Sequence, residues 1–307
     1  TAGGLLTEYL GWRAVFAVGV PLALLGALVA ARHLRGEWAE ARGQRFDWLG
    51  SLLYGPALVL LMYGFSHLPG RLGASLLAAG VVLLAAFLWW QARCPAPILD
   101  VRLFRANRPF ALSNLAALIN YSATAAVGFL LSLYLQYLGR LTPKQAGLVL
   151  VVQPLVMTLV SPWAGRLSDR VEPRLVASLG MGLSAVGLVL LQGLSPTGSL
   201  PWVLGCLVVL GAGFGLFSSP NTNAIMSSVE RQHYGVASGT MGTMRLTGQM
   251  LSMGVVMLMF AAHLGRQPIG PSNYPLFLQS VRAAFALFAA LCVGGIFASL
   301  VRGRIHR

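Results

Sequence analysis

The chain has 307 residues, of which 56% are hydrophobic and only 10% are charged. A soluble domain carries roughly a quarter charged residues, so this composition excludes an ordinary water-soluble globular protein. The formal net charge of +14 is spread over short segments between apolar blocks, which excludes the clustered basic face expected of a nucleic-acid-binding protein.

The apolar blocks are long enough to cross a membrane. A helix needs about 20 residues to span a hydrocarbon core of roughly 30 Å, and blocks of that length recur along the whole chain. We therefore expect an all-α integral membrane protein with about nine complete transmembrane helices. In chain order the expected spans are 12–31, 48–68, 72–91, 110–138, 147–164, 175–194, 201–219, 236–262 and 281–301.

The basic residues between these spans indicate an orientation. If the segment from Arg32 to Arg45 is cytoplasmic, every second loop follows it, and that side collects fifteen of the 22 basic residues against six on the other side. The one left over, Arg245, falls inside a span. Because Lys and Arg concentrate in cytoplasmic loops, we expect a multi-pass protein whose C-terminus is cytoplasmic.

Three stretches carry a family resemblance. Residues 165–170 read GRLSDR, the stretch from Gly211 begins GAGFGLFSSPNTNAIMSS, and the chain opens with TAGGLLTEYLGWR. The first is similar to the Gly-x-Leu-Ser/Ala-Asp-Arg loop motif of the major facilitator superfamily. The second resembles a later pair of spans in that superfamily, and the third resembles the end of its antiporter motif in the fifth span. Together they resemble the fourteen-span drug/proton antiporter branch.

The resemblance implies an organisation. In its register the chain supplies a remnant of span five and all of spans six to fourteen, so we expect an N-terminally truncated transporter. Residues 1–45 would end the N-terminal bundle, residues 46–93 would form an extra two-span hairpin, and residues 94–307 would form the C-terminal six-span bundle.

The resemblance also implies a function, namely proton-coupled efflux of amphipathic or cationic drugs by alternating access across the inner membrane of a bacterium. Export of a lipid or a native metabolite is the alternative. The implied partners are the lipid bilayer and a small amphipathic substrate, and a periplasmic adaptor protein is compatible with the branch. The coupling ion would be the proton, with no other cofactor.

The motif at Gly165, Arg166, Asp169 and Arg170 is expected in a tight cytoplasmic loop. There Asp169 could pair with a neighbouring arginine or with the start of the next helix, and the resemblance implies a gate that breaks as the protein changes conformation. The other interpretation is a solvated turn whose arginines only set the topology.

Polar residues within the expected spans are the candidates for a substrate cavity. Arg245 is the strongest, because an ionisable residue deep in a span is a functional candidate by default, although it could instead bond to a neighbouring helix. For each of Asn114, Asn120, Tyr121, Gln153 and Met157 taken singly, bonding between neighbouring helices is the better explanation. The full set of candidates is Asn114, Asn120, Tyr121, Gln153, Met157, Met241, Arg245 and Gln249.

Other motifs argue against an enzyme. The histidines and cysteines show no spacing typical of a metal site, and no nucleophile and base lie together within a span. Gly211, Gly213 and Gly215 lie inside an apolar block, so they predict close helix packing rather than a nucleotide loop. All eight acidic residues fall outside the expected spans or at their edges, so a proton-coupling carboxylate is expected in spans that precede this sequence.

Overall fold

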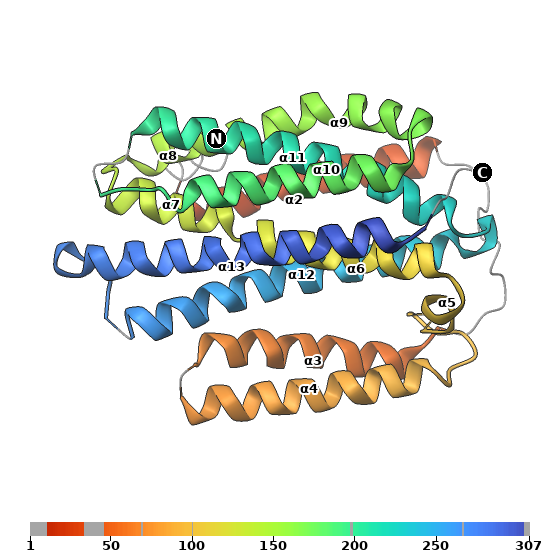
Figure 1. The fold of residues 1–307 in the computed structure, drawn as a ribbon. Coiled ribbons are helices and arrows are strands. Elements are labelled where there is room, and N and C mark those ends of the chain that lie inside the picture. The colour runs from red at the N-terminus through yellow and green to blue at the C-terminus, as the bar shows by residue number, and fades with distance from the viewer. Residues whose placement is uncertain are drawn as a thin grey trace.

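The computed structural model describes residues 11–33, 46–68, 70–99, 101–196, 199–265 and 267–303, and the regular structure within these ranges is helical. Figure 1 shows long helices lying side by side. Within the described residues, nine segments have the length and hydropathy to cross a membrane. The all-α fold and the expected number of spans are thereby confirmed.

The spans alternate in direction along the chain. They are α2 (Trp12–His33), α3 (Trp48–Ser66), α4 (Arg71–Gln91), α6 (Arg108–Thr124) with α7 (Val127–Tyr137), α8 (Pro143–Leu150) with α9 (Val152–Arg170), α10 (Pro173–Leu191), α11 (Leu200–Ser227), α12 (Tyr234–His263) and α13 (Tyr274–Val301). A short helix, α5 (Val101–Ala106), precedes α6. We call the end of the molecule that holds Arg302 the C-terminal side, and the end that holds His263 the opposite side.

Side-chain caps determine where several spans begin. The Asn107 side chain accepts a hydrogen bond from the Phe110 amide, and the Ser199 side chain accepts one from the Trp202 amide. Thr142 and Gln145 form a reciprocal capping box at the start of α8. These caps satisfy backbone N–H groups that the first helical turn leaves without partners.

Glycines let α10 and α11 approach closely. A Cβ atom added at Gly213 would lie 2.6 Å from Ser184 Oγ and 2.8 Å from the Gly180 carbonyl oxygen. Gly211 and Gly215 face α9 instead, where an added Cβ would lie 2.5 Å from the Gln153 carbonyl oxygen and 3.1 Å from that of Met157, respectively. Close packing by these three glycines is therefore confirmed, as small residues permit in membrane helices.

The buried core lies among α7, α10, α11 and α13. Its fully buried members include Leu130, Leu188, Leu207, Phe285 and Phe288. Apolar side chains also cover the outside of the molecule, which suits a surface that faces hydrocarbon. Helix α2 has no buried side chain among those described.

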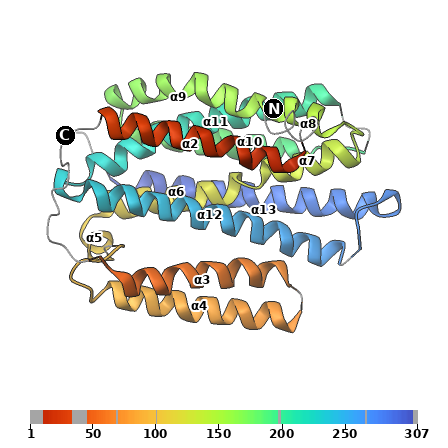
Figure 2. The same ribbon diagram turned by 180° about the vertical axis from the view of Figure 1, so that it is seen from behind.

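Helices α3 and α4 form a hairpin at one edge of the molecule. They pack along each other's length and reach the remaining helices through α12 (Figures 1 and 2). Gly64 and Gly80 make this pairing close, because a Cβ added at either would lie 2.8 to 2.9 Å from a leucine of the other helix. The division of the chain into 1–45, 46–93 and 94–307 remains a prediction.

Candidate functional site

A cavity of about 320 Å³ lies between four spans. Its walls come from the α6–α7 span, the α8–α9 span, α11 and α12. The lining residues are Tyr121, Thr124, Ala125, Gly128, Leu150, Gln153, Pro154, Met157, Phe214, Arg245 and Gln249.

Five of the side chains proposed from the sequence meet at this cavity. Tyr121 comes from α6, Gln153 and Met157 from α9, and Arg245 and Gln249 from α12. They lie up to 128 residues apart in the chain, between Tyr121 and Gln249, and the packing of separate spans brings them together. A role in substrate binding remains a prediction for each of them.

The other three candidates do not line the cavity. Asn114 and Asn120 are fully buried on α6, where Asn114 Nδ2 donates to the Phe110 carbonyl oxygen at 2.9 Å. The Asn120 carboxamide has no hydrogen-bond partner among the described residues. Met241 lies nearer the start of α12, where its sulfur accepts a hydrogen bond from Thr222 Oγ1 at 3.6 Å.

Both spans that carry α6 to α9 lose a helical hydrogen bond beside the cavity, although their backbones keep helical dihedral angles there, and we call these two points the breaks. Between α6 and α7, the Ala126 amide donates to Ser252 Oγ of α12 at 3.0 Å instead of to a carbonyl one turn back. In the first turn of α9, Pro154 lacks the N–H that would bond to the Leu150 carbonyl at the end of α8. Interrupted helices are tolerated at membrane depth where they line a cavity, and transporters use them to form binding sites.

The sequence alone did not reveal the first of these breaks. The two spans were expected to be continuous over 110–138 and 147–164. Thr124, Ala125, Gly128 and Leu150 were consequently not proposed as cavity residues. Pro154 was the available signal for the second break, because a proline inside a helix removes a hydrogen bond. The first break depends on Ser252, which is 126 residues from Ala126.

Arg245 and two aromatic rings form one side of the cavity. The Arg245 guanidinium carbon lies 5.6 Å from the centre of the Tyr121 ring, within the range of a cation–π interaction. The Tyr121 ring in turn meets Phe214 edge to face, with 5.5 Å between the ring centres. The site therefore offers a permanent positive charge beside an aromatic surface.

The motif from Gly165 to Arg170 lies on the C-terminal side. It was expected in a tight loop, which was wrong: α9 continues to Arg170 and the chain turns only at Val171 and Glu172, before Pro173. The residue that precedes a proline is disfavoured in helical conformation, and α9 accordingly ends just before Glu172 and Pro173, six residues after the expected end of the span at residue 164.

The motif contacts α11 through its small residues. Ser168 Oγ accepts a hydrogen bond from Asn223 Nδ2 at 3.0 Å, and a Cβ added at Gly165 would lie 3.0 Å from Ser219 Oγ. Arg166, Asp169 and Arg170 are exposed. Asp169 borders a groove that Asn223 and Tyr234 also line. Within the described residues its carboxylate forms no ion pair, so it is accessible to a partner outside them.

A buried arginine was missed by the sequence analysis. Arg302 follows α13 and is 1% exposed; its Nη1 donates to Ser113 Oγ at 3.1 Å and to Asn221 Oδ1 at 2.9 Å. Burial lowers the pKa of Arg302 to about 10, with the charge of Glu172 acting in the opposite direction. The guanidinium is therefore protonated at neutral pH, and it joins α6, α11 and α13.

A second missed network closes the α3–α4 hairpin on the C-terminal side. Asp47, which caps α3, accepts hydrogen bonds from the Gly50 amide at 2.8 Å, Trp90 Nε1 at 2.9 Å and Gln91 Nε2 at 2.6 Å. Burial tends to raise the pKa of Asp47, but the hydrogen bonds together outweigh it and the pKa is lowered. The carboxylate is thus ionised and structural.

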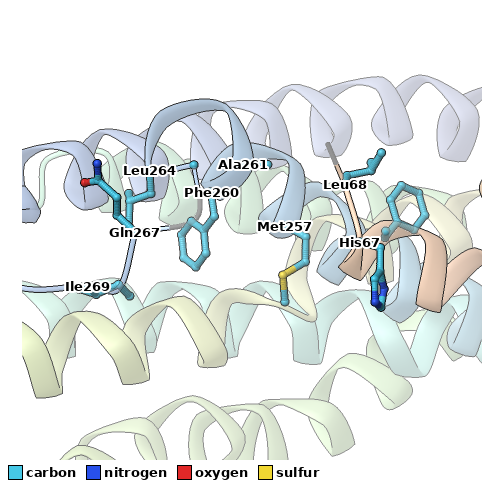
Figure 3. Close-up of a pocket in the computed structure, with 10 residues that line it drawn as sticks. His67, Leu68, Met257, Phe260, Ala261, Leu264, Gln267 and Ile269 are labelled. Carbon is cyan, nitrogen blue, oxygen red and sulfur yellow. The ribbon is translucent and has the colours of Figure 1, made fainter. Parts of the chain in front are cut away.

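Figure 3 shows another hollow, of about 450 Å³, between the hairpin and α12 on the opposite side. Met257 and Phe260 of α12 line it together with His67 and Leu68 at the end of α3. It lies at the edge of the molecule, away from the helix breaks.

A multi-pass helical membrane protein with a polar cavity at interrupted spans has the architecture of a membrane transporter. The family description Major Facilitator Superfamily matches residues 113–306, which is more than half of the chain. The chain belongs to this superfamily, and the fold expected from the sequence is confirmed.

Relatives in this superfamily include transporters with different named substrates. The chain is 30% identical over 300 residues to the riboflavin transporter RibZ of Clostridioides difficile (strain 630), covering 96% of this chain and 64% of RibZ. It is 31% identical to the transporter YebQ of Escherichia coli (strain K12), covering 99% and 65% of the two chains. It is 30% identical to the multidrug resistance protein Stp of Mycobacterium tuberculosis (strain ATCC 25618 / H37Rv), covering 86% and 50%.

Proposed function

We propose that the chain forms part of a secondary transporter that exports small amphipathic drugs by alternating access. The observation that carries this proposal is the cavity at the two helix breaks, where Arg245, Gln153 and Gln249 face an aromatic and apolar wall. Such a surface suits molecules that combine a ring system with a polar group. Similarity to a protein named for multidrug resistance supports it.

Two parts of the proposal rest on the resemblance alone. These are the coupling of transport to protons and membership of the fourteen-span branch. A periplasmic adaptor protein also remains a prediction. The resemblance extended the substrates to cationic drugs, but none of the described residues that line the cavity is acidic and could attract them, so we restrict the proposal to amphipathic substrates. Export of a native metabolite is the second candidate, because one relative is named a riboflavin transporter.

We further propose that the protein lies in a bacterial cytoplasmic membrane with its C-terminal side facing the cytoplasm. Basic residues are more frequent on that side among those described. They are Arg32, Arg93, Arg102, Arg105, Arg108, Arg166, Arg170, Arg174, Arg231 and Arg302 there, against Arg13, Arg71, Arg140, Lys144 and Arg282 on the opposite side. This distribution supports the orientation through the preference of Lys and Arg for cytoplasmic loops.

Filling the cavity is expected to stop export. Met157→Trp replaces a flexible side chain in the cavity with a bulky indole ring. Leu159→Trp places the same ring on the outside of α9, where the Leu159 side chain is 64% exposed. In cells without their own drug exporters, the wild-type protein and Leu159→Trp should lower the accumulation of amphipathic drugs. Met157→Trp should leave accumulation at the level of cells without the transporter, at equal amounts of membrane-inserted protein.

A protonophore tests the coupling separately, because it should restore accumulation in cells with the active forms. If Met157→Trp exports as well as wild type, the cavity is not on the transport path. If no drug in a chemically varied panel is exported by wild type, whereas a native metabolite is, the second candidate function replaces the first.

Asp169→Asn is expected to slow transport several-fold without changing the amount of inserted protein. The substitution removes the charge of the proposed gate while keeping the size of the side chain, and Asp169 is exposed and without an ion pair among the described residues. Efflux rates in membrane vesicles at equal protein levels provide the measurement. An unaltered rate for Asp169→Asn would remove Asp169 from the mechanism.

A further inference from the structure

The described lining of the cavity carries a positive charge and no negative charge to balance it. Among the described residues that line it, Arg245 is the only one with a charged side chain, and none is acidic. The acidic residues that the structure describes are Asp47, Asp169, Glu172 and Glu230, and each lies at or beyond the C-terminal side of a span. None of these carboxylates is in a position to neutralise Arg245.

The hydrogen-bond donors of the cavity are also free to bind a ligand. The contact shown for Arg245 is the face of the Tyr121 ring, which leaves its N–H groups free of an acceptor among the described residues. The carboxamides of Gln153 and Gln249 line the same cavity and likewise make no hydrogen bond to the described part of the chain. A guanidinium presents five N–H donors in a planar fork that matches a carboxylate.

The aromatic surface lies next to these donors. Tyr121 contacts both Arg245 and Phe214, and Met157 adds a polarizable side chain to the lining. A ligand with an anionic group attached to a flat ring could therefore place the anion against Arg245 and the ring against Tyr121 and Phe214. A ligand with an ammonium group would meet a like charge and no acceptor with a negative charge.

We infer that this cavity selects anionic amphiphiles, with a carboxylate or sulfonate beside a planar ring, and that Arg245 is the residue that determines this specificity. The inference rests on the proposed function and narrows its substrate class. It also distinguishes the two explanations of Arg245 that the sequence left open, since a purely structural arginine would not discriminate among ligands by their charge.

Binding of matched probes tests the inference without requiring transport. The probes are a coumarin carboxylic acid, its uncharged methyl amide and an analogue with an ammonium group in the same position. The complete protein is purified in lipid nanodiscs, and the dissociation constant of each probe is measured by fluorescence titration. We expect the wild-type protein to bind the carboxylate at least tenfold more tightly than the amide, and the ammonium analogue most weakly.

Three variants assign the preference to Arg245. Arg245→Gln should weaken carboxylate binding to the level of the amide while leaving amide binding unchanged. Arg245→Lys should retain only part of the preference, because an ammonium group cannot form two parallel hydrogen bonds with one carboxylate. Arg231→Gln removes an exposed charge just before the same helix, outside the cavity lining, and should behave as wild type.

The inference would be overturned if wild-type protein bound the ammonium analogue as tightly as the carboxylate, a result that needs no variant. Equal weakening of all three probes by Arg245→Gln would also overturn it, because that pattern indicates a structural role. Failure of the proposed function has a different signature. In that case the carboxylate preference persists in nanodiscs, although cells that contain the protein export none of the drugs tested.

Discussion

Gly213→Val is expected to lower the thermal unfolding midpoint of the purified protein by on the order of 5 to 10 °C, which corresponds to about 3 kcal/mol. An added Cβ would lie 2.7 Å from the Ser184 amide nitrogen and 2.8 Å from the Gly180 carbonyl oxygen. Backbone atoms of a packed helix cannot move aside as the end of a long side chain can. Helices α10 and α11 must therefore separate, and the contacts on both sides of Gly213 are weakened.

Gly205→Val is the matched control for this prediction. Gly205 lies on the same helix, is exposed, and has no atom within 4 Å of an added Cβ. The change in helix propensity is the same in both variants, so the difference between their midpoints isolates the close approach. Equal midpoints for the two variants would show that α10 and α11 are not held together at Gly213.

These glycines also show which features of the fold can be predicted from sequence. Length and hydropathy predicted the nine spans, since a helix must hide its polar backbone wherever it crosses hydrocarbon. Gly211, Gly213 and Gly215 are spaced two residues apart within an apolar span. In that setting such a pattern indicates close packing between helices. In both cases the physical constraint is local, and the relevant information lies within one segment.

The cavity could be predicted only in part, because its geometry is not local. Polarity within a span identified Arg245 and Gln153 as candidates. The same criterion selected Asn114 and Asn120, which the structure buries away from the cavity. Which side of α6 faces the cavity depends on the position of the other spans, and the sequence of α6 has no signal for it.

The C-terminal side shows the same limit. Arg302 was placed beyond the last span and was counted only as a basic residue that sets topology. Its burial depends on Ser113 and Asn221, which lie 189 and 81 residues away. A charged side chain directly after an apolar span ordinarily extends towards water. The inward direction of Arg302 is set by its partners on α6 and α11, and the sequence around Arg302 does not indicate it.

Asn221→Leu is expected to destabilise the protein by about 3 kcal/mol. The Asn221 carboxamide accepts a hydrogen bond from Arg302 at 2.9 Å and donates one to the Ser113 carbonyl oxygen at 3.1 Å. Leucine has a similar volume but provides neither bond. The Arg302 guanidinium would remain buried and charged, with Ser113 Oγ as its remaining acceptor among the described residues, and a buried charge that loses its partner is costly.

Asn223→Leu provides the control on the same helix, because Asn223 is exposed and its single bond to Ser168 should contribute about 1 kcal/mol or less. The double variant Asn221→Leu with Arg302→Met should recover much of the lost stability, since it removes the charge together with its partner. Thermal unfolding in nanodiscs measures five purified proteins: the wild type, the three single variants Asn221→Leu, Asn223→Leu and Arg302→Met, and the double variant. If the double variant is as unstable as the sum of its single changes, Arg302 and Asn221 act independently, and the proposed connection of α6, α11 and α13 through the buried guanidinium is wrong.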